Sequence, residues 1–213
     1  MPDAVIFDLD GTLFDTEPIW MASWPVAFGA QGLEVLPGVI DACMGTARDQ
    51  LLAIVDEWYH GDPRARQAAL DHYDVAREGL LAGAPMKPGA KELLALLGER
   101  GVPCAVASSS ASDLVHAHLA RAGIEDSFAT VVCGDEVERS KPAPDIFLMA
   151  ADLLGVDPAR AMVVEDSPNG VAAGRAGGFF VVLVPDVVEP GDETLAACDV
   201  RVSSLLELRD LLA

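Results

Sequence analysis

The sequence is poor in positive charge, with 14 Lys and Arg against 34 Asp and Glu in 213 residues. The formal net charge of −20 argues against binding nucleic acid or an anionic membrane through bulk electrostatics. The same charge repels anionic substrates at long range. Physiological salt screens it beyond about 8 Å, so a local cationic site can still bind an anion. Most of the acidic residues are therefore interpreted as a solvated surface.

Cysteines and long apolar runs are also scarce. The four cysteines form no C-x-x-C pair, and their spacings predict no zinc site. Cys104 and Cys133 lie in apolar runs and are predicted to be buried thiols. No apolar run is long enough to span a bilayer, and the first residues lack the pattern of a secretion signal. We therefore expect a cytoplasmic protein.

Short apolar runs, by contrast, recur along the chain, and hydrophobic residues make up 51% of it. The runs predicted to be buried strands are 4–7, 104–107, 130–133, 161–164, 179–184 and, more weakly, 199–202. Segments with helical spacing lie between the later runs, at 89–99, 112–122, 144–154 and 170–176. Strands that alternate with helices predict a Rossmann-like, doubly wound parallel α/β sheet.

The interval between the first two strands is too long for a simple crossover. It contains only helical patterns, at 17–29, 39–44, 48–58 and 63–81. We therefore predict an α/β core domain of residues 1–14 and 86–213 and an inserted all-helical cap domain of residues 15–85. Segments 14–16 and 83–87 are the expected connecting strands. We expect a monomer, because cap and core account for the apolar helix faces.

A pair of carboxylates stands where the first predicted strand ends. Asp8 and Asp10 are two residues apart, so an extended chain directs both to the same face. Gly11 and Thr12 follow and supply a turn whose backbone N–H groups can bind an oxyanion. One carboxylate can serve as a nucleophile and the other as a general acid and base. The alternative is a solvated turn.

Small hydroxyl groups follow the second strand, at Ser108, Ser109 and Ser110. With the N–H groups of a turn they can hold phosphate oxygens. The alternative interpretation is that Ser110 or Ser112 caps the following helix. The two interpretations are compatible, since a helix N-terminus is itself an anion site.

A lysine and two acids follow later strands. Lys141 is held between Ser140 and Pro142 in a base-poor chain, where a surface lysine is the alternative. Glu165 and Asp166 end the 161–164 run and would repel each other without a nearby cation. Oxygen ligands of this kind suit Mg²⁺. The alternative is that Asp166 or Ser167 caps the next helix.

Together these motifs resemble the haloacid dehalogenase superfamily in order, spacing and position at strand ends, over essentially the whole chain. The motifs are Asp8-x-Asp10-Gly11-Thr12, Ser108, Lys141-Pro142 and Glu165-Asp166. The insertion after the first strand resembles the subgroup with a helical cap, which includes β-phosphoglucomutase and many sugar-phosphate phosphatases.

The resemblance implies a role for each matched residue. Asp8 corresponds to the nucleophile that forms an aspartyl-phosphate, and Asp10 to the general acid and base. Dehalogenases and P-type ATPases lack an aspartate at the Asp10 position, so its presence favours a phosphatase or a phosphomutase. The implied phosphate-binding residues are Ser108 with Ser109, and Lys141. The implied Mg²⁺ ligands are Asp8, the Asp10 carbonyl, Asp166 and, less regularly, Glu165.

The predicted cap carries candidates for binding the rest of the substrate. Residues 45–48 resemble the specificity loop of the β-phosphoglucomutase cap, where Arg48 matches an arginine, although a surface arginine is an equal alternative. Residues 15–20 resemble hexitol-phosphate phosphatases, so Glu17 and Trp20 become candidate substrate contacts. Trp24 and Phe28 are interpreted as core.

The resulting hypothesis is a Mg²⁺-dependent phosphatase that hydrolyses a small phosphorylated metabolite, a sugar or polyol phosphate, through an aspartyl-phosphate. A sugar phosphomutase is the alternative enzyme. Trp20 argues against it, because the mutase has a histidine there. A non-catalytic binding protein on the same fold is a third hypothesis, disfavoured because no core catalytic position is degraded.

Overall fold

A computed structural model describes residues 1–44, 48–187 and 189–213, apart from the side chain of Arg48. The chain divides into two compact units. Met1–Asp15 with Pro85–Ala213 form the core unit, and Thr16–Ala84 form the helical unit. These divisions lie one residue from the domain boundaries predicted from the sequence. The expected connecting strands are reduced to a single antiparallel bridge, Phe14 with Met86, inside the core unit.

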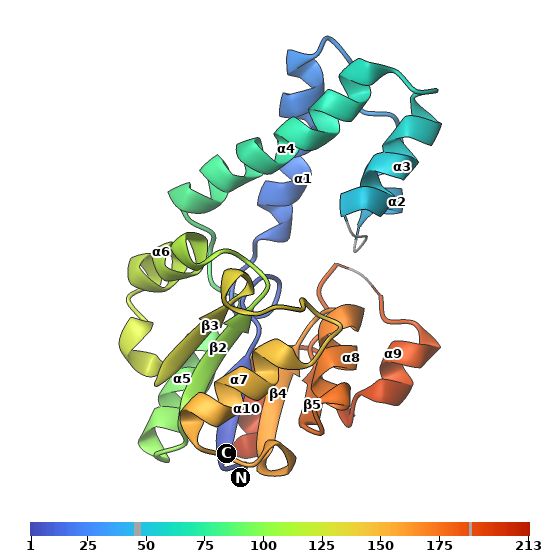
Figure 1. Ribbon diagram of the computed structural model, residues 1–213. Coiled ribbons are helices and arrows are strands. Elements are labelled where there is room, and N and C mark those ends of the chain that lie inside the picture. The colour runs from blue at the N-terminus through green and yellow to red at the C-terminus, as the bar shows by residue number, and fades with distance from the viewer. Residues whose placement is uncertain (45–47, 188) are drawn as a thin grey trace. The chain divides into compact units, whose positions relative to one another are not determined.

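The core unit contains a six-stranded sheet in the spatial order β3-β2-β1-β4-β5-β6 (Figure 1). Every neighbouring pair of strands is parallel. The strands are β1 (Ala4–Phe7), β2 (Cys104–Ser108), β3 (Thr130–Cys133), β4 (Ala161–Glu165), β5 (Phe180–Leu183) and β6 (Val200–Arg201). This arrangement confirms the predicted doubly wound α/β fold. The order reverses beside β1, and such a reversal leaves a ligand crevice at the carboxyl ends of the strands.

Helices cover both faces of the sheet, and the strands are therefore buried as continuous apolar runs. Figure 1 shows α7 and α8 on one face and α5 and α10 on the other. The core-unit helices are α5 (Ala90–Glu99), α6 (Ser112–Ala122), α7 (Asp145–Leu154), α8 (Pro168–Ala176), α9 (Asp192–Ala197) and α10 (Leu205–Leu212). Short 3-10 turns are η1 (Glu125–Ser127), η2 (Gly134–Glu136) and η3 (Pro158–Arg160). Cys104 and Cys133 are buried, as predicted.

Two of these helices, α9 and α10, were not predicted from the sequence. They have six and eight residues, too few for a helical period to stand out. A local signal for α10 was nevertheless present, since Ser204 and Glu207 have the Ser-x-x-Glu spacing of a helix start. In the structure the Ser204 hydroxyl accepts the N–H of Glu207 at 3.2 Å.

The helical unit consists of α1 (Glu17–Ala30), α2 (Val39–Cys43), α3 (Arg48–Trp58) and α4 (Pro63–Ala82). Its core includes Trp24 and Phe28, which confirms their interpretation as core residues. The helix α4 begins as the sequence would favour. Pro63 occupies its first position, and the Asp62 side chain accepts the N–H of Arg64 at 2.9 Å.

An aromatic cluster surrounds His72 inside this unit. The imidazole stacks on Trp24 with ring centroids 4.7 Å apart, and Trp20 meets it edge-on at 6.1 Å. Its Nδ1 lies 3.2 Å from the Ser23 hydroxyl. Its Nε2 is buried without a hydrogen-bond partner among the described residues. Burial lowers the pKa of His72 to about 4, so the imidazole is neutral in the folded protein.

This lowered pKa predicts a pH-dependent stability of the helical unit. In the unfolded chain His72 binds a proton when the pH falls below its ordinary pKa of about 6.5. In the folded unit it does so only when the pH falls to about 4. The stabilisation is therefore complete above pH 6.5 and is lost as the pH falls towards 4. We expect a loss of about 1–3 kcal/mol in the free energy of unfolding. Tryptophan fluorescence reports this unit, since all three tryptophans lie in it.

The control for this prediction is a pair of histidine substitutions. His72→Phe keeps the aromatic stacking and should flatten the pH dependence between 6.5 and 4. His60 is exposed in the same unit at a φ of 54°, which asparagine also tolerates, so His60→Asn should leave the pH dependence unchanged. Equal slopes for wild type and His72→Phe would contradict the assignment.

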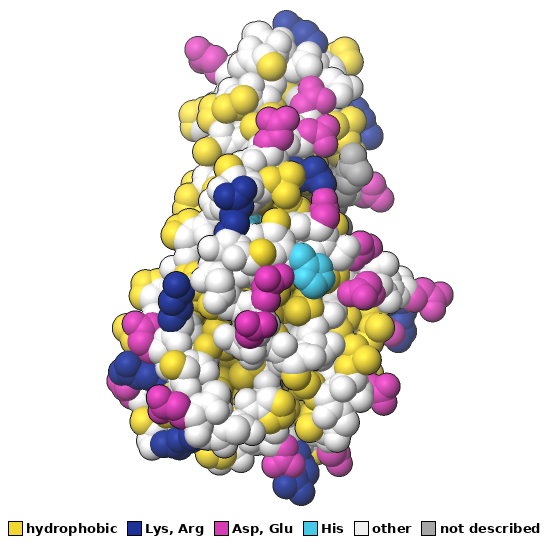
Figure 2. Space-filling view, turned by 90° about the vertical axis from the view of Figure 1, so that its left-hand side faces the viewer, with side chains coloured by type: hydrophobic (Ala, Val, Ile, Leu, Met, Phe, Trp, Pro, Cys, Tyr) yellow, Lys and Arg dark blue, Asp and Glu magenta, His cyan; other side chains and the backbone are white. Residues whose placement is uncertain are grey.

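The surface agrees with the charge of the sequence. On the face drawn in Figure 2, acidic side chains are spread widely, and the Lys and Arg side chains stand singly rather than as a basic patch. That distribution does not suit recognition of a nucleic-acid backbone. Among the described helices, none has the length and apolar character needed to cross a membrane.

Candidate active site

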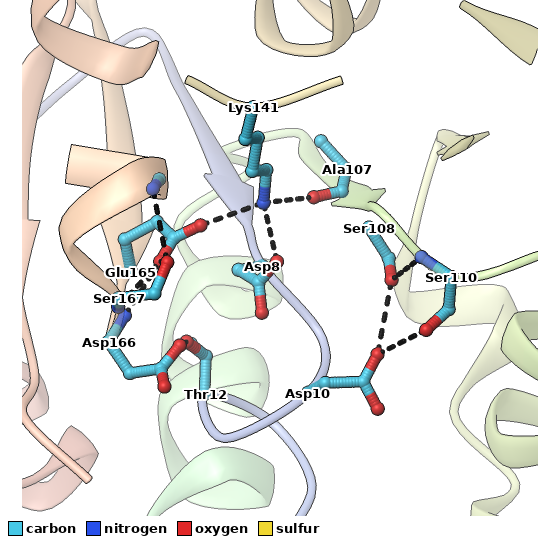
Figure 3. Close-up of polar contacts among 11 residues, drawn as sticks. Asp8, Asp10, Thr12, Ala107, Ser108, Ser110, Lys141, Glu165, Asp166 and Ser167 are labelled. Atoms are coloured by element: carbon cyan, nitrogen blue, oxygen red, sulfur yellow. Dashed lines mark hydrogen bonds and ion pairs between the residues drawn. The ribbon is translucent and has the colours of Figure 1, made fainter. Parts of the chain in front are cut away.

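The predicted acidic residues of the core unit lie together at the carboxyl ends of three neighbouring strands. Asp8 follows β1, Ser108 ends β2 and Glu165 ends β4. Because β1 pairs with both β2 and β4 in parallel, its end lies between theirs. Figure 3 shows Asp8 in the middle, with Glu165 and Asp166 on one side and Asp10 on the other.

Lys141 binds three of these groups with its ammonium. Its Nζ lies 2.5 Å from Asp8 Oδ1, 2.7 Å from Glu165 Oε1 and 3.0 Å from the Ala107 carbonyl oxygen. The side chains of Lys141, Asp8 and Glu165 are only 5%, 9% and 1% exposed. Removing one partner of such a buried cluster leaves an uncompensated charge and is strongly unfavourable. Lys141 is therefore part of the site and not a surface lysine.

The electrostatics of the site favour additional positive charge. Burial raises the pKa of Asp8 to about 8, and Glu165 and Asp10 add to this, while Lys141 opposes it. Burial, followed by the charges of Glu165 and Asp8, raises the pKa of Asp166 well above its ordinary value. For Lys141, burial lowers the pKa, but the charges of Asp8 and Glu165 outweigh this effect. The net result is a raised pKa. One lysine thus faces two buried carboxyl groups, those of Asp8 and Glu165, and the half-buried carboxyl group of Asp166.

Glu165 is bonded on both of its carboxylate oxygens. While Oε1 accepts from Lys141, Oε2 accepts the N–H groups of Asp166 and Ser167 and the Ser167 hydroxyl, each at 2.9 Å. The Ser167 hydroxyl also accepts the N–H of Gly170 at 3.0 Å, which confirms that it caps α8. Glu165 therefore positions Lys141 and the start of α8. Its role as a metal ligand stays a prediction.

Asp10 is held by serines that follow β2. Its Oδ2 accepts from the Ser110 hydroxyl at 2.7 Å and from the Ser108 hydroxyl at 3.3 Å. The sequence pointed to Ser108 and Ser109, but Ser109 is exposed, and Ser110 makes the shorter bond to Asp10. Neither Ser110 nor Ser112 caps α6, since Ala111 is its N-cap. The signal for Ser110 was its place in the serine triplet.

The turn after β1 approaches Asp166 closely because it contains Gly11. Gly11 has a φ of +85°, and a Cβ there would lie 2.4 Å from Asp166 Oδ2. The next residue, Thr12, donates its hydroxyl to Asp166 Oδ1 at 3.2 Å. The glycine and the threonine of the motif therefore bring the two acidic segments together.

The candidate substrate contacts of the helical unit are Glu17, Trp20 and Arg48. Trp20 is half-buried and meets His72 and Tyr73 edge-on. Glu17 lies half-buried in the first turn of α1. Residues 45–47 and the side chain of Arg48 lie outside the described part of the chain. A substrate contact by Glu17, Trp20 or Arg48 stays a prediction.

Comparison with known proteins identifies the family. Residues 2–178 match the model of the haloacid dehalogenase-like hydrolases, and the chain belongs to this family. The predicted membership is confirmed, and so is the predicted enzyme class, a phosphatase among these hydrolases.

Relatives that are named as phosphatases align with most of the chain. It is 32% identical to hexitol phosphatase B of Escherichia coli K12 over 216 residues, 98% of this chain and 96% of the relative. It is 33% identical to the fructose-1-phosphate phosphatase of that strain over 178 residues, 84% of this chain and 94% of the relative. The structure of CbbY from Rhodobacter sphaeroides in complex with phosphate is similar with a TM-score of 0.78 and 28% identity, covering 98% of this chain and 96% of that one.

Proposed function

We propose that the protein is a Mg²⁺-dependent phosphatase that hydrolyses a sugar or polyol phosphate through an aspartyl-phosphate. The observation that carries the proposal is the buried contact of Lys141 with Asp8 and Glu165, beside Asp10 and Asp166. This contact supports the proposal because it brings a carboxylate that can act as a nucleophile and a fixed cation together at one edge of the sheet, beside a second carboxylate. Such a set serves phosphoryl transfer.

In the first step, the Asp8 carboxylate attacks the phosphorus of the bound monoester. The bond from phosphorus to the alcohol oxygen breaks, and Asp10 donates a proton to the departing oxygen. Lys141 offsets the repulsion between the phosphate and the Asp8 carboxylate and stabilises negative charge on the phosphoryl oxygens. Phosphate monoesters need this help because their uncatalysed hydrolysis is extremely slow. Enzymes can therefore accelerate it by up to about 10²¹-fold.

In the second step, water attacks the phosphorus of the aspartyl-phosphate. Asp10 takes a proton from this water, and the bond between phosphorus and the Asp8 oxygen breaks, which releases inorganic phosphate and restores Asp8. Acting as acid and then as base requires a carboxyl group held in place. The hydroxyls of Ser110 and Ser108 on Asp10 Oδ2 supply that support.

The residues present fit Mg²⁺. The buried carboxylates of Asp8 and Glu165 and the half-buried carboxylate of Asp166 lie together with one lysine, and oxygen ligands suit this cation. We assign the carboxylates of Asp8 and Asp166 and the backbone carbonyl of Asp10 as its ligands, with Glu165 supporting them. When bound, the ion supplies Lewis-acid stabilisation of the phosphoryl oxygens.

The substrate class rests on the relatives and on the helical unit. Two relatives are named for hexitol and fructose-1-phosphate hydrolysis. We assign the helical unit as a cap that closes over the substrate and reopens for product release. Trp20 would stack on the sugar carbon chain, while Glu17 and Arg48 would bind its polar groups. We further propose that the enzyme is a monomer. We also propose that it works in the cytoplasm, and its four free cysteines are consistent with a reducing compartment.

The experiment that tests the proposal is a panel of sugar, polyol and nucleotide monophosphates assayed for phosphate release with Mg²⁺. We expect the highest kcat/KM for a hexitol or hexose phosphate. Release from nucleotides alone would overturn the substrate class. An isomerised sugar phosphate that accumulates faster than free phosphate would overturn the phosphatase and indicate a mutase.

Removal of the metal provides a separate prediction. Chelation with EDTA should lower turnover at least about 100-fold, because the cation stabilises the transition-state charge, and excess Mg²⁺ should restore it. Mg²⁺ at about 100 times its Kd should also stabilise the fold by about 2.7 kcal/mol, measured by thermal unfolding. This stabilisation should shrink in Asp166→Asn. Full activity in EDTA would contradict the assignment.

A further inference from the structure

Three side chains of the core unit meet where the chain leaves this unit and re-enters it. Asp15 is the last residue before the helical unit, and Lys87 follows the return at Pro85. Asp186 belongs to the segment after β5. The Nζ of Lys87 lies 3.0 Å from Asp15 Oδ1 and 2.5 Å from Asp186 Oδ1. This Lys87 cluster (Asp15, Lys87 and Asp186) joins both connecting segments to one loop of the core unit.

The connecting segments are also joined through their backbones. The N–H of Asp15 donates to the carbonyl of Pro85 at 2.8 Å, and the N–H of Lys87 donates to the carbonyl of Leu13 at 2.8 Å. The antiparallel bridge described above lies between these bonds. The ion pair of Lys87 with Asp15 thus reinforces a short ladder that belongs to the core unit.

The burial and charge of the cluster make the lysine difficult to replace. The side chains of Lys87 and Asp186 are only 19% and 14% exposed. Burial lowers the pKa of Lys87, but the hydrogen bonds and charges of Asp186 and Asp15 outweigh this effect. The net pKa is therefore raised, and the ammonium stays charged. The Asp186 Oδ2 is buried without a partner among the described residues. Removing the lysine would leave two carboxylates close together without a counter-charge.

Lysine is also rare in this chain, which contains only Lys87, Lys91 and Lys141. Lys141 lies in the active site, and Lys91 is exposed on α5. A chain with net charge −20 thus places one of its three lysines at the segments that connect the two units.

We propose that Lys87 is a positioning residue for the reaction. This proposal rests on the proposed function, in which the helical unit closes over the substrate. Lys87 fixes residues 13–15 and 85–87 to the core unit, so that closure pivots at Thr16 and Gly83. These two residues are the N-cap of α1 and the C-cap of α4, and Gly83 has a φ of 113°. Ends of elements are the places where hinges absorb backbone changes.

The kinetic test compares three variants with the wild-type enzyme on its best substrate. Lys87→Met removes the ammonium and loosens the connecting segments. This lowers the fraction of molecules in which the helical unit is ready to close over the substrate. We expect KM to rise about 5-fold while kcat stays within about 2-fold, because Asp8, Asp10 and Lys141 are unchanged. Lys87→Arg should restore KM. Lys91→Met, the matched control, should leave both parameters unchanged.

A second measurement needs no substrate. Hydrogen exchange at the amides of Asp15 and Lys87, which donate across the ladder, should become about 10-fold faster in Lys87→Met. Asp186→Asn should give a change of the same kind. The Lys87→Met/Asp186→Asn double variant removes the repulsion, and a non-additive result is expected. This double variant keeps the test decisive if Lys87→Met alone fails to fold.

Several outcomes would overturn the proposal. Unchanged hydrogen exchange would show that the Lys87 cluster does not fix the connecting segments. Faster exchange with an unchanged KM would overturn the positioning role. If wild type releases phosphate from no substrate, the proposed function fails and the positioning role with it, whereas the exchange experiment still judges the Lys87 cluster itself.

Discussion

Asp8→Asn should abolish phosphate release, lowering kcat by about 10⁴- to 10⁶-fold, the range seen when one member of a catalytic triad is removed. The amide has nearly the shape of the carboxylate, and its oxygen can still accept from Lys141. It cannot form an acyl-phosphate by attacking phosphorus. Asp8 is buried at the end of β1, so solvent does not replace its carboxylate as the nucleophile in the variant. The measurement is single-turnover phosphate release with the best substrate from the panel.

The control separates chemistry from folding. Asp152→Asn makes the same chemical change on the exposed face of α7 and should retain full activity. Circular dichroism and thermal unfolding should show that Asp8→Asn is folded. Retained turnover in a folded Asp8→Asn enzyme would eliminate the aspartyl-phosphate mechanism.

The second large effect is expected for Gly170→Ala. A Cβ at Gly170 would lie 1.7 Å from Glu165 Oε1 and 1.8 Å from its Cδ, so the buried carboxylate must move. Overpacking of this kind costs about 1–3 kcal/mol, and here it also disturbs the bond from Glu165 to Lys141. We expect the midpoint of thermal unfolding to fall by about 2–12 °C. Turnover should fall at least about 10-fold, since misplaced catalytic groups lose rate steeply.

Gly98 offers the matched control for this substitution. It is also a helical glycine of the core unit, in α5, but a Cβ there meets nothing within 4 Å. Gly98→Ala should therefore stabilise the protein by about 0.4–1 kcal/mol and leave turnover unchanged. If Gly170→Ala were as stable and active as Gly98→Ala, the close approach of Gly170 to Glu165 would be refuted.

The strands of the core could be predicted because a parallel sheet is buried on both faces, so that each strand is a continuous apolar run. The run at 4–7 coincides with β1, and the run at 130–133 with β3. The short helices α9 and α10 escaped prediction, because six or eight residues carry too little periodicity.

The sequence by itself determined the doubly wound fold, the family and the residue types of the site, because local periodicity and motif spacing are written along the chain. Only the tertiary structure decided which side chains share a hydrogen bond. Ser110 rather than Ser109 holds Asp10, and Lys87 reaches Asp186 across 99 residues of sequence. Such contacts depend on strand order and side-chain rotamers, which linear spacing does not encode.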